Sequence, residues 1–209
     1  MIIAVDGPAA SGKGTIAKAL ADHYGLPLLD TGLLYRAVGV QVLRHHGDPA
    51  NAADALAACV FEDDLLADSM LRTAEAGDAA SKASVHPAVR AALLERQRGF
   101  ANQPGGAILD GRDIGTVIAP QADAKLYVTA SARVRAERRI KEFLANPDEA
   151  AILAYQKELE ARDERDMNRA DAPLRPADDA LLLDTSDLTI DAAVQQAIRL
   201  VETRISRQQ

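Results

Sequence analysis

The segment of residues 7–15 contains the residue types that bind a polyphosphate. It reads GPAASGKGT. Its glycines let backbone N–H groups turn toward phosphate oxygens, because no Cβ stands in the way. The ammonium of Lys13 can reach the β- and γ-phosphates of a nucleotide, and the hydroxyl of Thr15 can bind Mg²⁺ directly. We therefore predict a phosphate-binding loop that consists of Gly7, Pro8, Ala9, Ala10, Ser11, Gly12, Lys13, Gly14 and Thr15.

The sequence on either side supplies the two elements that such a loop requires. The short apolar run IIAV before the loop predicts a strand that is buried on both faces. After the loop, Ile16, Ala17, Leu20 and Ala21 recur at helical spacing. The helix that they predict begins near Lys13, and the positive end of its dipole faces the phosphates. This context argues against a glycine-rich turn that arose by chance.

Composition and charge exclude several classes of protein. The chain has 209 residues and a formal net charge of −7, which argues against a general binder of nucleic acid or membrane surfaces. Its single cysteine permits no internal disulfide, so a reducing compartment is expected. The first residues do not form a signal peptide, and no apolar run reaches the length of a membrane span. We expect a monomeric, cytoplasmic protein with no nucleic-acid or membrane partner.

Apolar and amphipathic segments alternate along the chain. Short apolar runs predict five strands, at residues 2–5, 28–30, 107–109, 125–128 and 181–183. Further helices are predicted at residues 33–44, 70–83, 87–102, 132–144 and 149–169, and a last one begins near Asp191. We expect Thr31 and Ser131 to cap the helices that follow them. This alternation predicts an α/β fold, with a parallel five-stranded sheet and helices on both faces.

Charged residues follow three of the predicted strands. Ligands of parallel α/β sheets bind beyond the carboxyl ends of the strands. Asp6, Asp30, Asp110 and Asp113 stand at such ends, so we expect them along one cleft. Asp110 is a candidate to hold Mg²⁺ through a water molecule. Arg36 and Arg112 also lie near strand ends, where they can hold a second phosphate group; a surface ion pair is the alternative.

Two clusters of arginine fall on predicted helices. Arg135 and Arg139 are four residues apart, so one helix face can present both. Arg162, Asp166 and Arg169 are spaced i, i+4 and i+7 and form one stripe. Guanidinium groups bind phosphate oxygens in pairs, and a closing lid can bring them onto a transferring group. Spacing alone favours a solvated helix face, with an ion pair between Arg162 and Asp166, because charged helices are common.

Several segments together resemble the bacterial cytidylate kinase family. They are the phosphate-binding loop, LLDTGLLYR at 28–36, DAASKASVHPAVR at 78–90, DGRDIGTVI at 110–118 and RDERDMNR at 162–169. The loop itself has the GKGT form that is typical of nucleoside monophosphate kinases. The resemblance covers nearly the whole chain. It implies a P-loop kinase of pyrimidine metabolism that uses ATP and Mg²⁺ to phosphorylate CMP and dCMP to the diphosphates.

The resemblance also implies roles for particular residues. The loop is expected to bind ATP, and Lys13, Arg135, Arg139 and Arg162 are expected to be catalytic. The expected CMP-binding residues are Asp30, Thr31, Tyr35, Arg36, Ser81, Arg90, Asp110, Gly111, Arg112, Asp113, Arg162, Asp166 and Arg169.

The family is divided into a CORE domain, an NMP-binding domain and a short mobile lid. Here the CORE corresponds to about residues 1–30, 105–130 and 170–209, the NMP-binding part to about 31–104, and the lid with its following helix to about 131–169. Family members often carry a longer insert with a small antiparallel sheet. The segment at residues 61–70 is too short for that sheet, so we expect an NMP-binding part of different shape.

Two other functions are compatible with parts of the sequence. One is a P-loop kinase for a different small acceptor, such as UMP, AMP or a non-nucleotide alcohol. The other is a nucleotide-dependent switch without transferase activity. Switches of this kind usually need a guanine site of the form N-K-x-D, and the sequence contains none.

Overall fold

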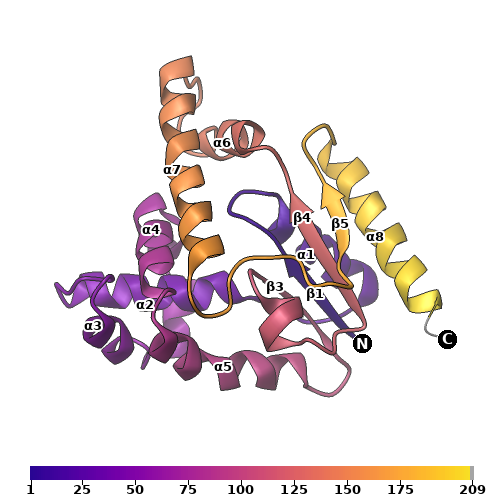
Figure 1. Cartoon of the computed structure of the whole chain (residues 1–209), viewed down its shortest axis with the longest axis horizontal. Helices are drawn as coiled ribbons and strands as arrows, with labels where there is room; N and C mark the ends of the chain where they lie inside the picture. Colours follow the sequence, from indigo (N-terminus) through magenta and orange to yellow (C-terminus); the bar gives the residue numbers. More distant parts are fainter. Residues whose placement is uncertain (208–209) are drawn as a thin grey trace.

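Five parallel strands form the centre of the protein (Figure 1). The computed structural model describes residues 1–207. The strands lie in the order β2-β3-β1-β4-β5. They span Ile2–Asp6 (β1), Leu28–Asp30 (β2), Ala107–Gly111 (β3), Ala124–Thr129 (β4) and Leu181–Asp184 (β5). The predicted α/β fold with its five-stranded parallel sheet is therefore confirmed.

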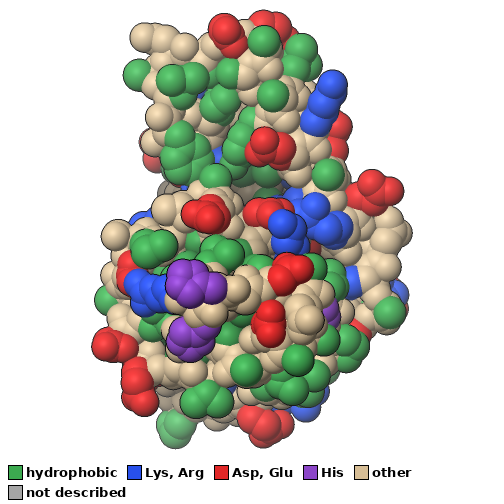
Figure 2. All heavy atoms as spheres, turned by 90° about the vertical axis from the view of Figure 1, so that its left-hand side faces the viewer, with side chains coloured by type: hydrophobic (Ala, Val, Ile, Leu, Met, Phe, Trp, Pro, Cys, Tyr) green, Lys and Arg blue, Asp and Glu red, His purple; other side chains and the backbone are tan. Residues whose placement is uncertain are grey.

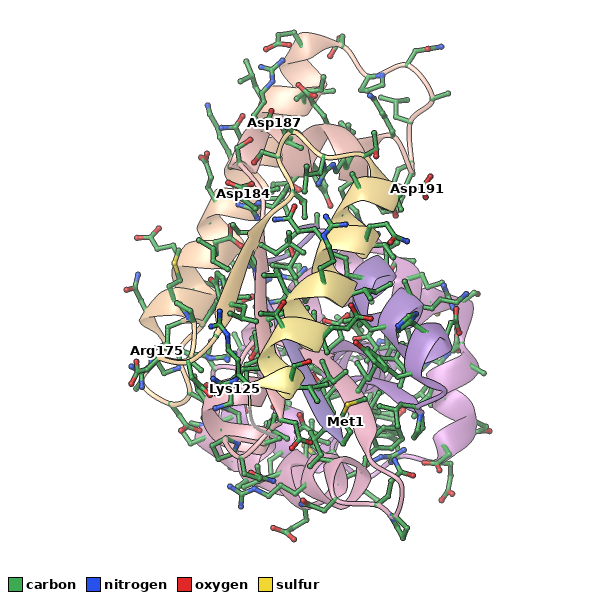
Figure 3. All side chains as sticks on the ribbon, turned by 90° about the vertical axis from the view of Figure 1, so that its right-hand side faces the viewer. Met1, Lys125, Arg175, Asp184, Asp187 and Asp191 are labelled. Carbon is green, nitrogen blue, oxygen red and sulfur yellow. The ribbon has the colours of Figure 1, made fainter. Side chains whose placement is uncertain are left out.

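Side chains of the central strand alternate between two apolar layers, as strand geometry requires. Ile3 and Val5 pack with residues of α1 (Lys13–Tyr24) and α8 (Ile190–Ser206). Ala4 packs on the opposite side, with residues of α5 (Pro87–Ala101) and of the five-residue π-helix η3, Ile114–Ile118. Figure 3 shows α8 along its face of the sheet, with Asp184 at the end of β5, Asp187 in the connection and Asp191 in the first turn of α8.

Helices α2 (Thr31–Arg44), α3 (Ala52–Ala57) and α4 (Ala74–Ala83) form a second apolar cluster with α5. The short segment before α4 contains two 3₁₀ helices, η1 (Asp63–Ala67) and η2 (Ser69–Arg72). All described strands belong to the central sheet, so residues 31–104 form no sheet of their own.

Helices α6 (Ala132–Ile140) and α7 (Glu149–Asn168) pack against each other above the sheet. Leu159 of α7 and Ala136 of α6 enclose Ala9 of the phosphate-binding loop in a small apolar cluster. Figure 2 shows a waist between the α6–α7 part and the α2–α5 part, with Lys and Arg side chains gathered beside it. No helix within residues 1–207 is long and apolar enough to cross a membrane.

Three predicted helix ends are wrong in detail. Asp30, and not Thr31, caps α2, because its carboxylate accepts the N–H of Gly32 at 2.9 Å. Thr31 instead donates its hydroxyl to the carbonyl of Asp110 at 2.8 Å. The helix predicted at 70–83 is divided, since Thr73 caps α4 and η2 precedes it. The helix predicted at 132–144 ends at Ile140.

A buried carboxylate ties the central strand to the segment after β3. Asp6 is 4% exposed and accepts the backbone N–H groups of Ile114 and Gly115, each at 2.8 Å. These bonds hold the first turn of the π-helix against the end of β1. Burial raises the pKa of Asp6 to about 7 despite the two hydrogen bonds.

We predict a pH-dependent contribution of Asp6 to stability. Because its pKa is higher in the folded than in the unfolded chain, the folded chain binds more protons between about pH 4 and 7. The contribution is therefore complete at acid pH and is lost as the pH rises toward 7, by on the order of 2 to 4 kcal/mol. Urea unfolding of wild type and Asp6→Asn at pH 5 and pH 8 measures it. The variant should gain less stability on acidification; an equal gain in both proteins would contradict the assignment.

Candidate active site

The phosphate-binding loop connects β1 to α1 through a backbone that few residue types can adopt. Gly7 has a φ of +155°, and a Cβ there would lie 2.0 Å from the carbonyl oxygen of Val128. Gly12, at the start of α1, has a φ of +88°. Ala10 between them also has a left-handed φ, +59°. The loop is therefore curled as a phosphate-binding loop requires.

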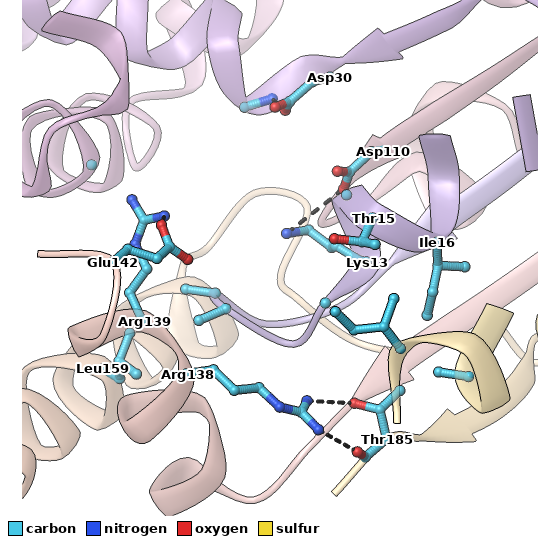
Figure 4. Close-up of a pocket in the computed structure, with 18 of the residues that line it drawn as sticks. Lys13, Thr15, Ile16, Asp30, Asp110, Arg138, Arg139, Glu142, Leu159 and Thr185 are labelled. Carbon is cyan, nitrogen blue, oxygen red and sulfur yellow. Dashed lines mark hydrogen bonds and ion pairs between the residues drawn. The ribbon is translucent and has the colours of Figure 1, made fainter. Parts of the chain in front are cut away.

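An ion pair joins this loop to the end of β3. The Lys13 ammonium lies 3.7 Å from Asp110 Oδ1, and the two side chains point toward each other in Figure 4. Burial raises the pKa of Asp110 to about 6, against the opposing effect of Lys13. Burial also lowers the pKa of Lys13, and the positive charge of Arg112 lowers it further. Both charges thus lie where water solvates them poorly.

These residues line one large cleft, which we call the main cleft. It has a volume of about 730 Å³, a size typical of sites for small molecules. Its wall combines the loop and strand ends with residues of α6, α7 and the β5–α8 connection. Figure 4 shows Arg138 and Arg139 on the α6 side, opposite Lys13. Among the site residues predicted from sequence, it contains Ala9, Ala10, Gly12, Lys13, Gly14, Thr15, Asp30, Arg36, Asp110, Arg112, Arg139 and Arg162.

Three arginines approach the inner end of this cleft. Arg36 donates to the carbonyls of Leu71 and Thr73, at 2.7 and 3.0 Å. No described carboxylate forms an ion pair with Arg162, and its buried Nε has no hydrogen-bond partner among the described residues. Burial and the positive charges of Arg112 and Arg36 lower the pKa of Arg162 to about 10. Cations held close together without matching anions favour the binding of an anionic ligand.

A smaller cavity of about 40 Å³, the inner pocket, adjoins the main cleft, and Arg112 and Arg162 line both. The carboxylate of Asp113 pairs with the guanidinium groups of Arg90 and Arg169. Arg90 also lies over the Tyr35 ring, 5.6 Å from its centroid. The remaining predicted CMP-binding residues of the inner pocket are Thr31, Ser81, Gly111 and Asp166. Every residue predicted to bind CMP therefore lines one of these two cavities.

The stripe of Arg162, Asp166 and Arg169 does not form the ion pair that its spacing predicts. Asp166 accepts from Arg112 Nε at 3.1 Å, and an ion pair between Arg162 and Asp166 is not formed. Arg169 follows the last helical residue and has an extended backbone. Its guanidinium still faces the inner pocket, where it lies 3.4 Å from Asp113 Oδ1. The alternative of a solvated helix face thus does not describe these residues.

Some predicted residues lie outside the two cavities. Gly7, Pro8 and Ser11 do not line them, and neither does Arg135, whose guanidinium is buried between α6, α7 and the loop. Sequence reasoning missed Thr185, which lines the main cleft directly after β5 and accepts from Arg138 at 3.0 Å. The rule that ligands bind beyond strand ends would have identified it.

The family implies Mg²⁺, and the oxygen atoms near Lys13 are suited to it. The cleft contains the Thr15 hydroxyl and the Asp110 carboxylate, whose buried Oδ1 has no hydrogen-bond partner among the described residues. Such hard oxygen donors are the ligands that Mg²⁺ prefers. Within the described residues no three His, Cys, Asp or Glu side chains gather to hold a metal ion.

Comparison with known proteins identifies the family of this chain. A family model described as cytidylate kinase matches residues 3–203. A cytidylate kinase of Xanthobacter autotrophicus is 56% identical over 204 residues, which cover 98% of each chain. One of Caulobacter sp. is 53% identical over 207 residues, 99% of this chain and 96% of that protein. The crystal structure of an uncharacterized protein from Eubacterium ventriosum shares the fold, with a TM-score of 0.54, 18% identity and coverage of 97% of this chain and 98% of that one. The chain belongs to the cytidylate kinase family.

Proposed function

We propose that this chain transfers the γ-phosphoryl group of ATP to CMP and dCMP. The observation that carries the proposal is the arrangement of the two cavities. The phosphate-binding loop lies at the main cleft, the inner pocket adjoins that cleft, and Arg112 and Arg162 stand at the junction. A donor in the cleft and an acceptor base in the pocket would therefore meet among positive charges. Family membership supports the same reaction.

Phosphoryl transfer needs positioning and neutralisation of charge more than it needs a base. Lys13 is placed to hold the β- and γ-phosphate oxygens of the donor. Arg139 and Arg162 reach the cleft from α6 and α7 and can neutralise charge on the transferring group. Thr15 and Asp110 would hold Mg²⁺, directly and through water. The metal would neutralise charge on the donor phosphates when bound.

We assign the binding of the phosphate group of CMP to Arg36, Arg112 and Arg162. Gly77 in α4 leaves space for two of them, because a Cβ there would lie 3.1 Å from both Arg36 Nη2 and Arg162 Nη1 and would require them to shift by a few tenths of an ångström. Gly is unfavourable inside a helix, so space for these two guanidinium groups explains its presence.

In the proposed division of the chain, about residues 31–104 and 131–169 close over the CORE. The same proposal includes Mg²⁺ as the metal that accompanies ATP. It also includes a monomeric state and a cytoplasmic location.

The reaction is tested by ADP release with a panel of acceptors at equal concentration. We expect turnover with CMP and dCMP and much slower turnover with UMP and AMP. Lys13→Met should fold but lose about 10²–10³ in rate, because one preorganised charge contact is removed. A preference for UMP or AMP would replace the proposed acceptor. ATP hydrolysis without any acceptor would favour the nucleotide-dependent switch.

The choice of base is predicted to depend on Asp113, Arg90 and Ser81. Cytosine presents an N4 amino donor, whereas uracil presents the O4 acceptor there and an N3–H donor. The Asp113 carboxylate can only accept hydrogen bonds, and Arg90 can only donate them. Arg90 Nη1 is buried and has no partner among the described residues, so it is available for cytosine N3 or O2. Ser81 adapts to either base and should add affinity more than discrimination.

Asp113→Asn should lower the CMP-to-UMP ratio of kcat/KM at least about tenfold, mainly through loss of CMP activity, because an amide can turn its N–H₂ toward O4. Asp171→Asn is the matched control: Asp171 pairs with Arg90 Nε at 3.4 Å but is half exposed and does not line the inner pocket. It should leave the ratio unchanged. If Asp113→Asn also leaves it unchanged, Asp113 has no part in base recognition.

Gly77→Ala should raise stability by up to about 1 kcal/mol, as Gly to Ala does in helices. It should also raise KM for CMP several-fold, because the new methyl group displaces Arg36 and Arg162. Gly99→Ala in α5 is the control, since a Cβ there meets nothing within 4 Å. It should raise stability without a change in KM. Thermal melts and CMP kinetics on both variants test this role of Gly77. An unchanged KM in Gly77→Ala would show that Arg36 and Arg162 adjust to the methyl group without loss of CMP binding.

A further inference from the structure

Arg135 is bound to three separate segments at once. Its Nε donates to the carbonyl of Ala130 at 2.9 Å, and Nη1 donates to the carbonyl of Ala9 at 3.0 Å. Its Nη2 lies 2.6 Å from Asp163 Oδ2 on α7. The residue is 5% exposed, and Asp163 is 6% exposed. The guanidinium therefore joins α6, α7 and the phosphate-binding loop, and it does not line the main cleft.

The bond to Ala9 determines how the loop presents its next N–H group. A planar trans peptide directs its C=O and N–H in opposite directions. Because the Ala9 carbonyl faces Arg135, the N–H of Ala10 faces away from it. Ala10 has a left-handed φ of +59°, which a residue with a Cβ keeps only when its surroundings hold it. Arg135 supplies one such restraint, and the apolar contact of Ala9 with Leu159 supplies another.

Asp163, which binds this guanidinium, lies on the same helix as two residues that line the inner pocket. Asp163 directly follows Arg162, which lines both cavities, and precedes Asp166 of the inner pocket by three residues. The position of α7 thus fixes Asp163, Asp163 fixes Arg135, and Arg135 fixes the Ala9–Ala10 peptide.

We propose that Arg135 is a positioning residue for the donor-binding loop, oriented by Asp163. It holds the Ala9–Ala10 peptide in the conformation that binds the donor phosphates, and it does not itself touch them. This inference rests on the proposed function for the identity of the donor as ATP.

The test compares ligand affinity and stability in separate variants. Arg135→Lys keeps a positive charge beside Asp163, but one ammonium cannot bind all three partners in place of the planar guanidinium. Its melting temperature should fall by a few degrees, because a buried carbonyl loses its donor, and the variant should stay folded under the assay conditions. Its Kd for a non-hydrolysable ATP analogue with Mg²⁺, measured by calorimetry, should rise about tenfold. Its Kd for CMP alone should change less than about twofold.

A double variant, Arg135→Met with Asp163→Leu, removes both charges and leaves neither one buried without a partner. It should show the same selective loss of donor affinity. Arg133→Met is the matched control, because Arg133 also joins α6 to α7, through Glu149, but contacts no residue of the loop. It should leave both affinities unchanged.

Donor affinity within twofold of wild type in both Arg135→Lys and the double variant would overturn the proposal and leave Arg135 a purely structural residue. An equal loss of donor and CMP affinity would also overturn it, because the residue would then support the whole site. Phosphorylation of a different acceptor by wild type would overturn the proposed function but leave this comparison of donor affinities intact.

Discussion

Repulsion among cations that share the main cleft is the constraint on which the rest of the site depends. Lys13, Arg36, Arg112 and Arg162 lie where water solvates them poorly, and like charges repel more strongly in such surroundings. Asp110 and Asp166 offset part of this repulsion, through Lys13 and Arg112. The remainder is left uncompensated at Arg162, and an anionic substrate can neutralise it. This excess of positive charge therefore favours the binding of phosphate groups.

The fold meets this constraint by bringing each charge from a different segment. Lys13 stands at the start of α1, Arg112 follows β3, and Arg162 comes from α7. Neighbouring parallel strands end at the same edge of the sheet, so the first two are brought together by the sheet itself. Arg162 depends on how α7 packs on α6 and on the loop. Because the three cations come from three segments, no single helix has to hold several unpaired cations.

Those parts of the site that depend on local sequence could be predicted, and those that depend on packing could not. The loop and the strand ends follow from glycine positions, apolar runs and the topology of parallel sheets. The spacing of Arg135 and Arg139 is compatible with one exposed face, yet Arg135 is buried and Arg139 lines the cleft. Contacts of Arg135 with residues distant in the chain decide this, namely with Asp163, 28 positions later, and with the carbonyl of Ala9. The predicted cap of α2 is one residue too late, because Asp30 and Thr31 are both good capping residues.

Two glycines show how strongly the site depends on room for charged groups. Gly14 stands where a typical P-loop has a hydroxyl residue, and a Cβ there would lie 3.2 Å from Asp110 Oδ2. Gly77 leaves the same kind of space between Arg36 and Arg162. Both glycines lie in helices without a left-handed φ, so backbone freedom does not explain them. At Gly14 a Cβ would displace the carboxylate beside Lys13 by a few tenths of an ångström, and the hydroxyl is found one position later, at Thr15. A glycine between Lys13 and Thr15 therefore leaves room for the ion pair between Lys13 and Asp110.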